Sequence, residues 1–104
     1  MKTNKLTGAA LDWAVAVAEY GYGADYKTNR YSTDWSQGGP IIEREGIELA
    51  MCSDQWRAVT HLESESIFKD GSTPLEAAMR CYCCAKLGDE VEIPTELTQG
   101  EVNE

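Results

Sequence analysis

Hydrophobic and polar positions recur along this chain with two different periods, which predict where it is helical and where it is extended. Between Gly8 and Tyr20, apolar residues recur at helical spacing over most of the circumference. Only Asp12 and Glu19, one above the other, form a polar stripe. A helix with so wide an apolar perimeter must be covered on more than one side, either by a sheet and a loop of the same chain or by a second subunit.

A period of two marks the middle of the chain. Residues 47–61 alternate between apolar and polar positions around a short turn, which predicts an antiparallel hairpin. Residues 62–72 are polar and acidic and predict a loop. The sequence Thr-Pro-Leu-Glu at 73–76 is a capping box with proline in the first turn. It predicts a second long helix that ends at Leu87.

Glycine, tyrosine and small polar residues dominate the segment between the first helix and the hairpin. Residues 21–39 predict an irregular stretch in which the glycine pair at 38–39 forms a hinge. Pro40 suits the first position of a helix, and Gly46 suits the residue after its end. We therefore predict one short helix at about 40–45.

In chain order, these elements predict an α+β domain. Its two main helices are expected to pack on a small antiparallel sheet, the hairpin at about 47–61, with the short helix beside them. A length of 104 residues supports one domain. We place this domain at residues 1–97, with a frayed start over residues 1–6 and a disordered tail at 98–104.

Charge narrows the classes of partner. Eighteen acidic residues against nine basic ones give a formal net charge of −9. Direct binding to nucleic acid is not expected, because contacts with phosphates need a basic face.

Lys2 and Lys5 precede an apolar stretch that resembles an export signal, but Asp12 interrupts it. No apolar run reaches the ~20 residues of a membrane span. We expect a cytoplasmic protein without membrane contact.

Residues capable of catalysis or metal binding form no known pattern. Cys81, Cys83 and Cys84 spread around the predicted helix and cannot converge on one metal, so we interpret them as small apolar filler, with Cys83 as an exposed thiol. His61 is the only histidine, and no nucleophile signature accompanies it. The acids lack the spacing of a calcium loop. We expect no catalytic residue, metal or cofactor.

The candidate binding surface is the segment 31–46 with its aromatic neighbours. Tyrosine and tryptophan among small residues are typical of recognition surfaces, and charged residues add directional contacts. The alternative is that Trp35, Ile41 and Ile42 only attach the segment to the first helix. A mixed outcome is expected, with Trp35 buried and Arg44 exposed. The candidate binding residues are Tyr22, Tyr26, Arg30, Tyr31, Asp34, Trp35, Glu43 and Arg44.

Three blocks of sequence resemble a family of small bacteriophage and prophage proteins, the NinX-like family, which is a domain of unknown function. The blocks are LTGAALDWAVA (6–16), YSTDWSQGGPIIEREGI (31–47), and TPLEAAMRCY (73–82) with KLGDEVEIP (86–94). The chain is more remotely similar to small phage domains with an α-β-α sandwich arrangement. The resemblance implies a phage or prophage origin, the cytoplasm of a bacterial host and an accessory role. It carries over no catalytic residue.

Three hypotheses for function follow. The leading one is a non-enzymatic accessory protein that binds a host or phage protein. The second is a binding protein for a small nucleotide-like ligand, held by stacking on the tyrosines and Trp35. The third is a small enzyme that uses His61. We also expect a homo-oligomer, because the first helix has more apolar perimeter than so short a chain is expected to cover.

Overall fold

The structure of the chain, a computed structural model, describes residues 1–22 and 29–97. Their elements share one hydrophobic core, and the predicted α+β class is confirmed. The predicted tail at 98–104 lies outside the described residues. The elements are η1 (Thr3–Lys5), α1 (Gly8–Tyr20), α2 (Trp35–Glu45), β1 (Glu48–Cys52), β2 (Gln55–His61), β3 (Ser66–Gly71), α3 (Pro74–Leu87) and η2 (Thr95–Leu97).

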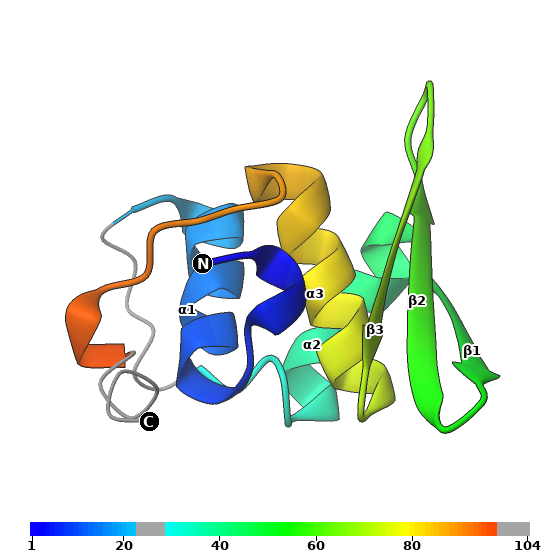
Figure 1. Ribbon diagram of the computed structural model, residues 1–104, viewed down its shortest axis with the longest axis horizontal. Coiled ribbons are helices and arrows are strands. Elements are labelled where there is room, and N and C mark those ends of the chain that lie inside the picture. Colours follow the sequence, from blue (N-terminus) through cyan, green and yellow to red (C-terminus); the bar gives the residue numbers. More distant parts are fainter. Residues whose placement is uncertain (23–28, 98–104) are drawn as a thin grey trace.

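Helix α3 lies at the centre of the fold, between α1 on one side and the sheet on the other (Figure 1). Helix α2 packs against α3 as well. Helix α3 begins as predicted, because the Thr73 side chain accepts a hydrogen bond from the Glu76 backbone N–H at 3.0 Å. The sheet therefore contacts mainly α3, and α1 forms a further layer behind it.

The apolar perimeter of α1 is covered within a single chain. Every residue from Ala10 to Val17 is buried, including Asp12. Helix α3 covers one side, and partly buried residues of the C-terminal segment, Ile93 and Leu97, pack against the same core. The apolar perimeter of α1 thus gives no reason to invoke a second subunit, and the expected homo-oligomer stays a prediction without that argument.

The prediction of a frayed start at residues 1–6 is wrong. Lys2 forms an isolated antiparallel bridge with Glu90. The Met1 ammonium group donates to the Val91 carbonyl at 2.7 Å, and the Val91 N–H donates to the Met1 carbonyl at 2.9 Å. Leu6 and Thr3 are fully buried. The first residues are therefore paired with the segment that follows α3.

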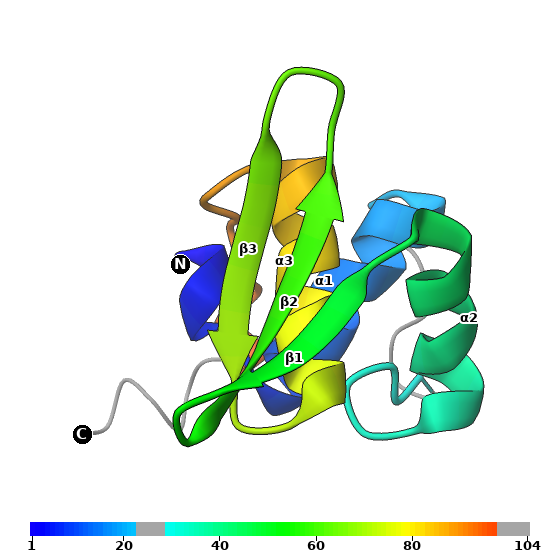
Figure 2. The ribbon, with the colours of Figure 1, turned by 90° about the vertical axis from the view of Figure 1, so that its right-hand side faces the viewer.

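The sheet has three antiparallel strands in the order β1-β2-β3 (Figure 2). The hairpin of β1 and β2 was predicted, but β3 replaces part of the predicted loop at 62–72. Strand β3 was missed because Ile67 and Phe68 are adjacent apolar residues rather than an alternating pair. Ile67 pairs with Thr60 and Phe68 with Val59, so they leave opposite faces of the sheet. Ile67 turns toward the core, whereas Phe68 is 54% exposed.

Helix α2 is longer than the predicted helix at 40–45, because it starts at Trp35 rather than at Pro40. Asp34 is its N-cap, and its carboxylate accepts from the Ser36 N–H at 2.9 Å. Gln37 Nε2 donates back to the Asp34 carboxylate at 3.3 Å. The N-cap residue Asp34 was thus a helix start signal that outweighed the glycine pair.

The glycine pair lies inside α2, and close packing explains the first of the two. A Cβ at Gly38 would lie 2.5 Å from the Tyr31 carbonyl oxygen and 2.6 Å from Leu75 Cδ2. At Gly39 the nearest atom would be Trp35 Cε3, at 3.6 Å. Gly38 therefore lets α2 approach both the preceding segment and α3, and the predicted hinge is wrong.

We predict that Gly38→Ala lowers the free energy of unfolding by about 1–3 kcal/mol, because backbone must move to admit the methyl group. Gly39→Ala is the matched control. Apart from its chain neighbours, its methyl meets nothing closer than Trp35 Cε3. The gain in helix propensity is opposed by the restriction that Pro40 places on the residue before it, so the same free energy should change by less than ~1 kcal/mol. Urea unfolding followed by circular dichroism measures both, and equal effects of the two substitutions would refute the packing role of Gly38.

The central position of α3 also determines how far its cysteine side chains are buried. Cys81 and Cys83 are fully buried, and Cys84 is nearly so. The exposed thiol predicted at Cys83 is therefore wrong, because α1 and the sheet cover α3 on two sides. Burial raises the pKa of the Cys81 thiol to about 11 and raises that of Cys83 as well. The thiols serve as small apolar side chains, as predicted for their packing.

Native alkylation should distinguish the four thiols. We predict that iodoacetamide at about pH 8 modifies the partly exposed Cys52 first, whereas Cys81 and Cys83 react only after unfolding. Peptide mass spectrometry over a time course measures the order. Labelling of Cys83 at the rate of Cys52 in the folded protein would contradict the buried position of α3.

Candidate functional site

The candidate residues do not gather at one place. Trp35 and Arg44 occupy opposite ends of α2, which separates their Cα atoms by roughly 14 Å. Tyr31 is buried against the core, and Asp34 is used as the N-cap of α2. Tyr26 lies outside the described residues. The fold therefore does not bring the described tyrosines, Trp35 and Arg44 together in a single pocket.

Arg44 is held in a cluster at the C-terminal ends of the helices. Its Nη2 atom lies 2.6 Å from Glu19 Oε2 on α1 and 3.2 Å from the Tyr82 hydroxyl oxygen on α3. Its Nε atom donates to Glu45 at 2.9 Å. Tyr82 also donates its hydroxyl to Glu19. Arg44 thus ties the three helices together, and its guanidinium is already engaged.

The cluster shifts the titration of its members. The hydrogen bond from Arg44 lowers the pKa of the Glu19 carboxyl below its usual range, although burial opposes this. Burial, followed by the hydrogen bond to Glu19, raises the pKa of the Tyr82 hydroxyl. Both shifts favour an ionised Glu19 and a neutral Tyr82 at neutral pH, which is the state in which all the hydrogen bonds of the cluster form.

This cluster should make stability depend on pH at the acidic end. A depressed carboxyl pKa stabilises the folded state above about pH 4.3, the ordinary value for glutamate. That contribution is lost as the pH falls through the folded-state pKa. We predict that Glu19→Gln lowers stability at pH 7 and that the difference from wild type shrinks below about pH 4.3. Urea unfolding at several pH values measures it, and a constant difference would exclude Glu19 as the titrating group.

Trp35 lies at the opposite end of the helices, where their N-terminal ends meet. Its side chain is 53% exposed, so the expectation that it is buried is wrong. A hollow of about 350 Å³ lies beside it. We call this region the Trp35 surface. Its residues are Thr7, Gly8, Ser32, Thr33, Trp35, Thr73, Pro74, Leu75 and Glu76.

A second hollow, of about 530 Å³, continues the Trp35 surface. Both hollows include Gly8, Ser32 and Thr33. Asp12 and Arg30 line the second one, and the buried Asp12 carboxylate accepts from the Ser32 N–H at 2.8 Å. The Ser32 hydroxyl is buried and has no hydrogen-bond partner among residues 1–22 and 29–97.

The remaining candidates lie apart from these two places. Tyr22 is 77% exposed, and its ring meets Trp13 edge-on with 6.1 Å between centroids. Glu43 is exposed on α2. Sequence reasoning identified Trp35 and Arg30, but it missed Ser32 and the start of α3. The capping box had marked Thr73 only as the start of a helix, and nothing local indicated that this start would adjoin Trp35.

His61 forms a chain of polar contacts on the open face of the sheet. Its Nδ1 atom lies 2.8 Å from Ser66 Oγ, and its Nε2 atom lies 3.3 Å from Glu48 Oε2. The order serine, histidine, carboxylate resembles that of a hydrolase. However, His61 and Glu48 are exposed on neighbouring strands, where water is not excluded. These side-chain contacts link strands β1, β2 and β3 across the open face of the sheet. They give no argument for catalysis.

Two kinds of feature are absent from residues 1–22 and 29–97. No helix there is both long and apolar enough to cross a membrane. Within the same residues, no group of three or more histidine, cysteine, aspartate or glutamate side chains is placed to hold a metal ion.

Together, these features define a small α+β domain with a buried central helix and an exposed tryptophan where three helices begin. The family model described as Bacteriophage P22, NinX, matches residues 2–86, and the chain belongs to this family of phage proteins. The match covers two of the three blocks that carried the resemblance and most of the third. The curated proteins contain no match to the chain.

Proposed function

We propose that this chain is a non-enzymatic phage accessory protein that binds a host or phage protein through the Trp35 surface. The family supports the phage accessory role. The observation that carries the binding surface is the exposure of Trp35. The core encloses Trp13 at 9% exposure, whereas Trp35 is 53% exposed in the first turn of α2.

The chemistry of the surface favours a protein partner. Tryptophan is enriched among the residues that contribute most to binding at protein interfaces. The hollow beside it has room for one partner side chain, and the threonines at its rim supply hydroxyl groups for hydrogen bonds. The unsatisfied Ser32 hydroxyl is the kind of buried polar group that a partner can pair after a small rearrangement.

The expectations about the type of partner and about the alternative functions can now be compared with this role, and they remain proposals. An acidic chain is compatible with a protein partner inside the bacterial host. Its net charge of −9 disfavours direct binding to nucleic acid. A nucleotide-like ligand has weaker support, because Tyr31 is buried and Arg44 is paired with Glu19. An enzyme that uses His61 has weaker support still, since the histidine lies on an open sheet face.

We predict that Trp35→Ala lowers the affinity for the partner by about 30-fold or more, or about 2 kcal/mol. The experiment captures partners from infected host cells with the tagged wild-type protein and then measures affinity for the purified, stoichiometric partner by calorimetry. The change removes contact area at the surface and leaves the core intact.

Met51→Ala is the matched control, because Met51 is 56% exposed on the sheet, away from the Trp35 surface. It should bind like wild type, and thermal unfolding should show that both variants are folded. If Met51→Ala weakens binding while Trp35→Ala does not, the interface lies on the sheet and the proposal is wrong. Failure to find any stoichiometric partner in infected cells would also reject it.

A further inference from the structure

Asp12 is a buried acid on α1 without a counter-ion. Its side chain belongs to a residue that is only 5% exposed, and its carboxylate accepts one hydrogen bond, from the Ser32 N–H at 2.8 Å. Within residues 1–22 and 29–97 it forms no ion pair. Asp12 lies beyond the first turn of α1, where the positive end of the helix dipole adds little. A buried carboxylate in this state lowers the stability of the fold and attracts any cation that can reach it.

The other acid on the polar stripe of α1 shows what Asp12 lacks. Glu19, further along the same helix, lies 2.6 Å from Arg44 and accepts a hydrogen bond from the Tyr82 hydroxyl. Both of these partners come from neighbouring helices. Asp12 has a backbone N–H instead, and it lines a hollow. The fold thus neutralises one end of the stripe and leaves the other end open to a ligand.

Two acids and one base line the two hollows that meet at the start of α1. Glu76 lines the Trp35 surface, and its carboxylate is engaged, since it accepts from the Thr7 hydroxyl at 2.6 Å. Arg30 lines only the second hollow, and it is exposed. Its Nη1 atom donates to a backbone carbonyl at 3.0 Å, and it forms no ion pair with Asp12. Asp12 is therefore the lining charge that a ligand can neutralise.

Two uncharged groups beside Asp12 also suit a cation that carries N–H donors. The Ser32 hydroxyl is buried without a partner among the described residues, and Ser32 lines both hollows. Its oxygen can accept a hydrogen bond from the same group that pairs with Asp12. The exposed indole of Trp35 borders the adjoining hollow, and tryptophan is the ring that attracts cations most strongly.

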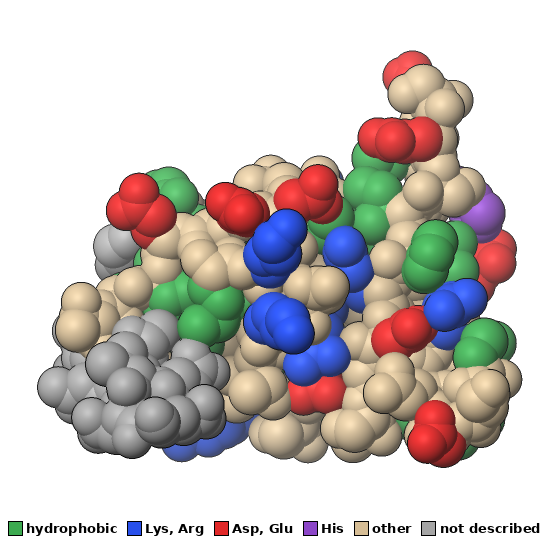
Figure 3. Space-filling view, in the orientation of Figure 1, with side chains coloured by type: hydrophobic (Ala, Val, Ile, Leu, Met, Phe, Trp, Pro, Cys, Tyr) green, Lys and Arg blue, Asp and Glu red, His purple; other side chains and the backbone are tan. Residues whose placement is uncertain are grey.

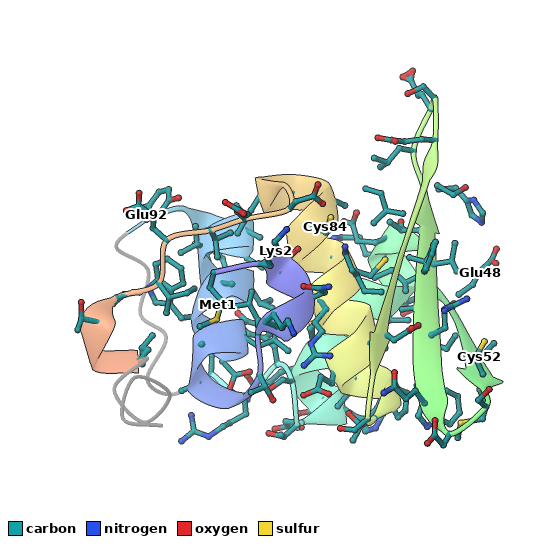
Figure 4. The ribbon with its side chains drawn as sticks, viewed as in Figure 1. Met1, Lys2, Glu48, Cys52, Cys84 and Glu92 are labelled. Carbon is teal, nitrogen blue, oxygen red and sulfur yellow. The ribbon has the colours of Figure 1, made fainter. Side chains whose placement is uncertain are left out.

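The basic side chains of the described chain are used elsewhere. In the view of Figure 3, most of them gather over the middle of the molecule, around η1 and α3. Lys2 is labelled in that region in Figure 4. Other basic side chains on helices and strands already face a carboxylate; these are Arg44, Arg57, Arg80 and Lys86. A partner can supply the missing cation, and the net charge of −9 attracts a basic one.

We propose that the hollow at Asp12 receives a lysine or arginine side chain of the partner protein. The cationic head donates hydrogen bonds to the Asp12 carboxylate and the Ser32 hydroxyl. Its apolar stem lies along the indole of Trp35, as long basic side chains do on apolar surfaces. This inference rests on the proposed function, because it names the residue type that the partner places beside Trp35.

A blocked arginine residue, N-acetyl-arginine methylamide, probes the hollow without any partner. It should shift the Ser32 amide and Trp35 indole signals in nuclear magnetic resonance spectra more strongly than the blocked norleucine and glutamate residues do. Asp12→Asn should weaken its binding about tenfold, because a hydrogen bond to a charged group is lost. Arg30→Gln should strengthen its binding, because it removes a like charge from the second hollow.

The Asp12→Asn variant keeps a side-chain carbonyl that can accept from the Ser32 N–H, so it should fold. Its midpoint in urea should equal or exceed that of wild type, because a buried charge without a counter-ion has been removed. Ser32→Ala, which keeps the buried charge, should weaken the arginine probe about threefold. Glu48→Gln is the matched control, since it removes an acid from the sheet, away from α1 (Figure 4). It should bind the probe like wild type.

The proposal is overturned if the arginine probe binds no better than norleucine, or if Asp12→Asn binds it equally well. Weaker binding by Arg30→Gln would indicate an anionic ligand and would also overturn it. So would a lower urea midpoint of Asp12→Asn, which would show that Asp12 is already paired within the chain.

The purified partner separates this inference from the proposed function. Both hold if Trp35→Ala and Asp12→Asn each weaken partner binding. If Trp35→Ala weakens it and Asp12→Asn does not, the Trp35 surface stands and the cation site is refuted. If neither variant weakens it, both are refuted.

Discussion

The burial of α3 on two opposite sides is the constraint on which the rest of the structure depends. A helix between another helix and a sheet cannot present a polar stripe to solvent over its whole length, so its residues must be small or apolar where the layers meet. Ala77, Ala78 and Cys81 meet this requirement. The polar residues it does carry are all engaged, as Arg80 shows by holding η1 and β3 and Tyr82 by joining Glu19 and Arg44.

The sequence predicted those elements whose local signals agree with their place in the fold. Helix α3 has a capping box at its start, and its bounds were predicted correctly. Helix α1 was also found from its periodicity. Strand β3 was missed because both of its faces carry an apolar residue, and alternation fails when the outer face holds Phe68. The glycine pair was misread because a glycine that admits a neighbouring backbone looks the same in sequence as one that bends the chain.

The candidate site could be predicted only in part, since its surfaces arise from contacts distant in sequence. Trp35 was correctly chosen as a residue of interest, but its neighbours come from the starts of α1 and α3. Arg44 looked available because a charged residue on a short helix is usually solvated. Its partners on α1 and α3 become evident only when the three helices lie together.

The three long helices run in the same direction, because their N-terminal ends meet at the Trp35 surface (Figure 1). Parallel neighbours cannot be joined by tight turns, so the chain must return along the molecule between each pair. The sheet makes the return between α2 and α3. The bridge between Lys2 and Glu90 then closes almost the whole length of the chain. The contacts that join the helices to one another and the two ends of the described chain therefore form only after large loops have closed, and such a topology folds more slowly than an up-and-down helical bundle of equal length.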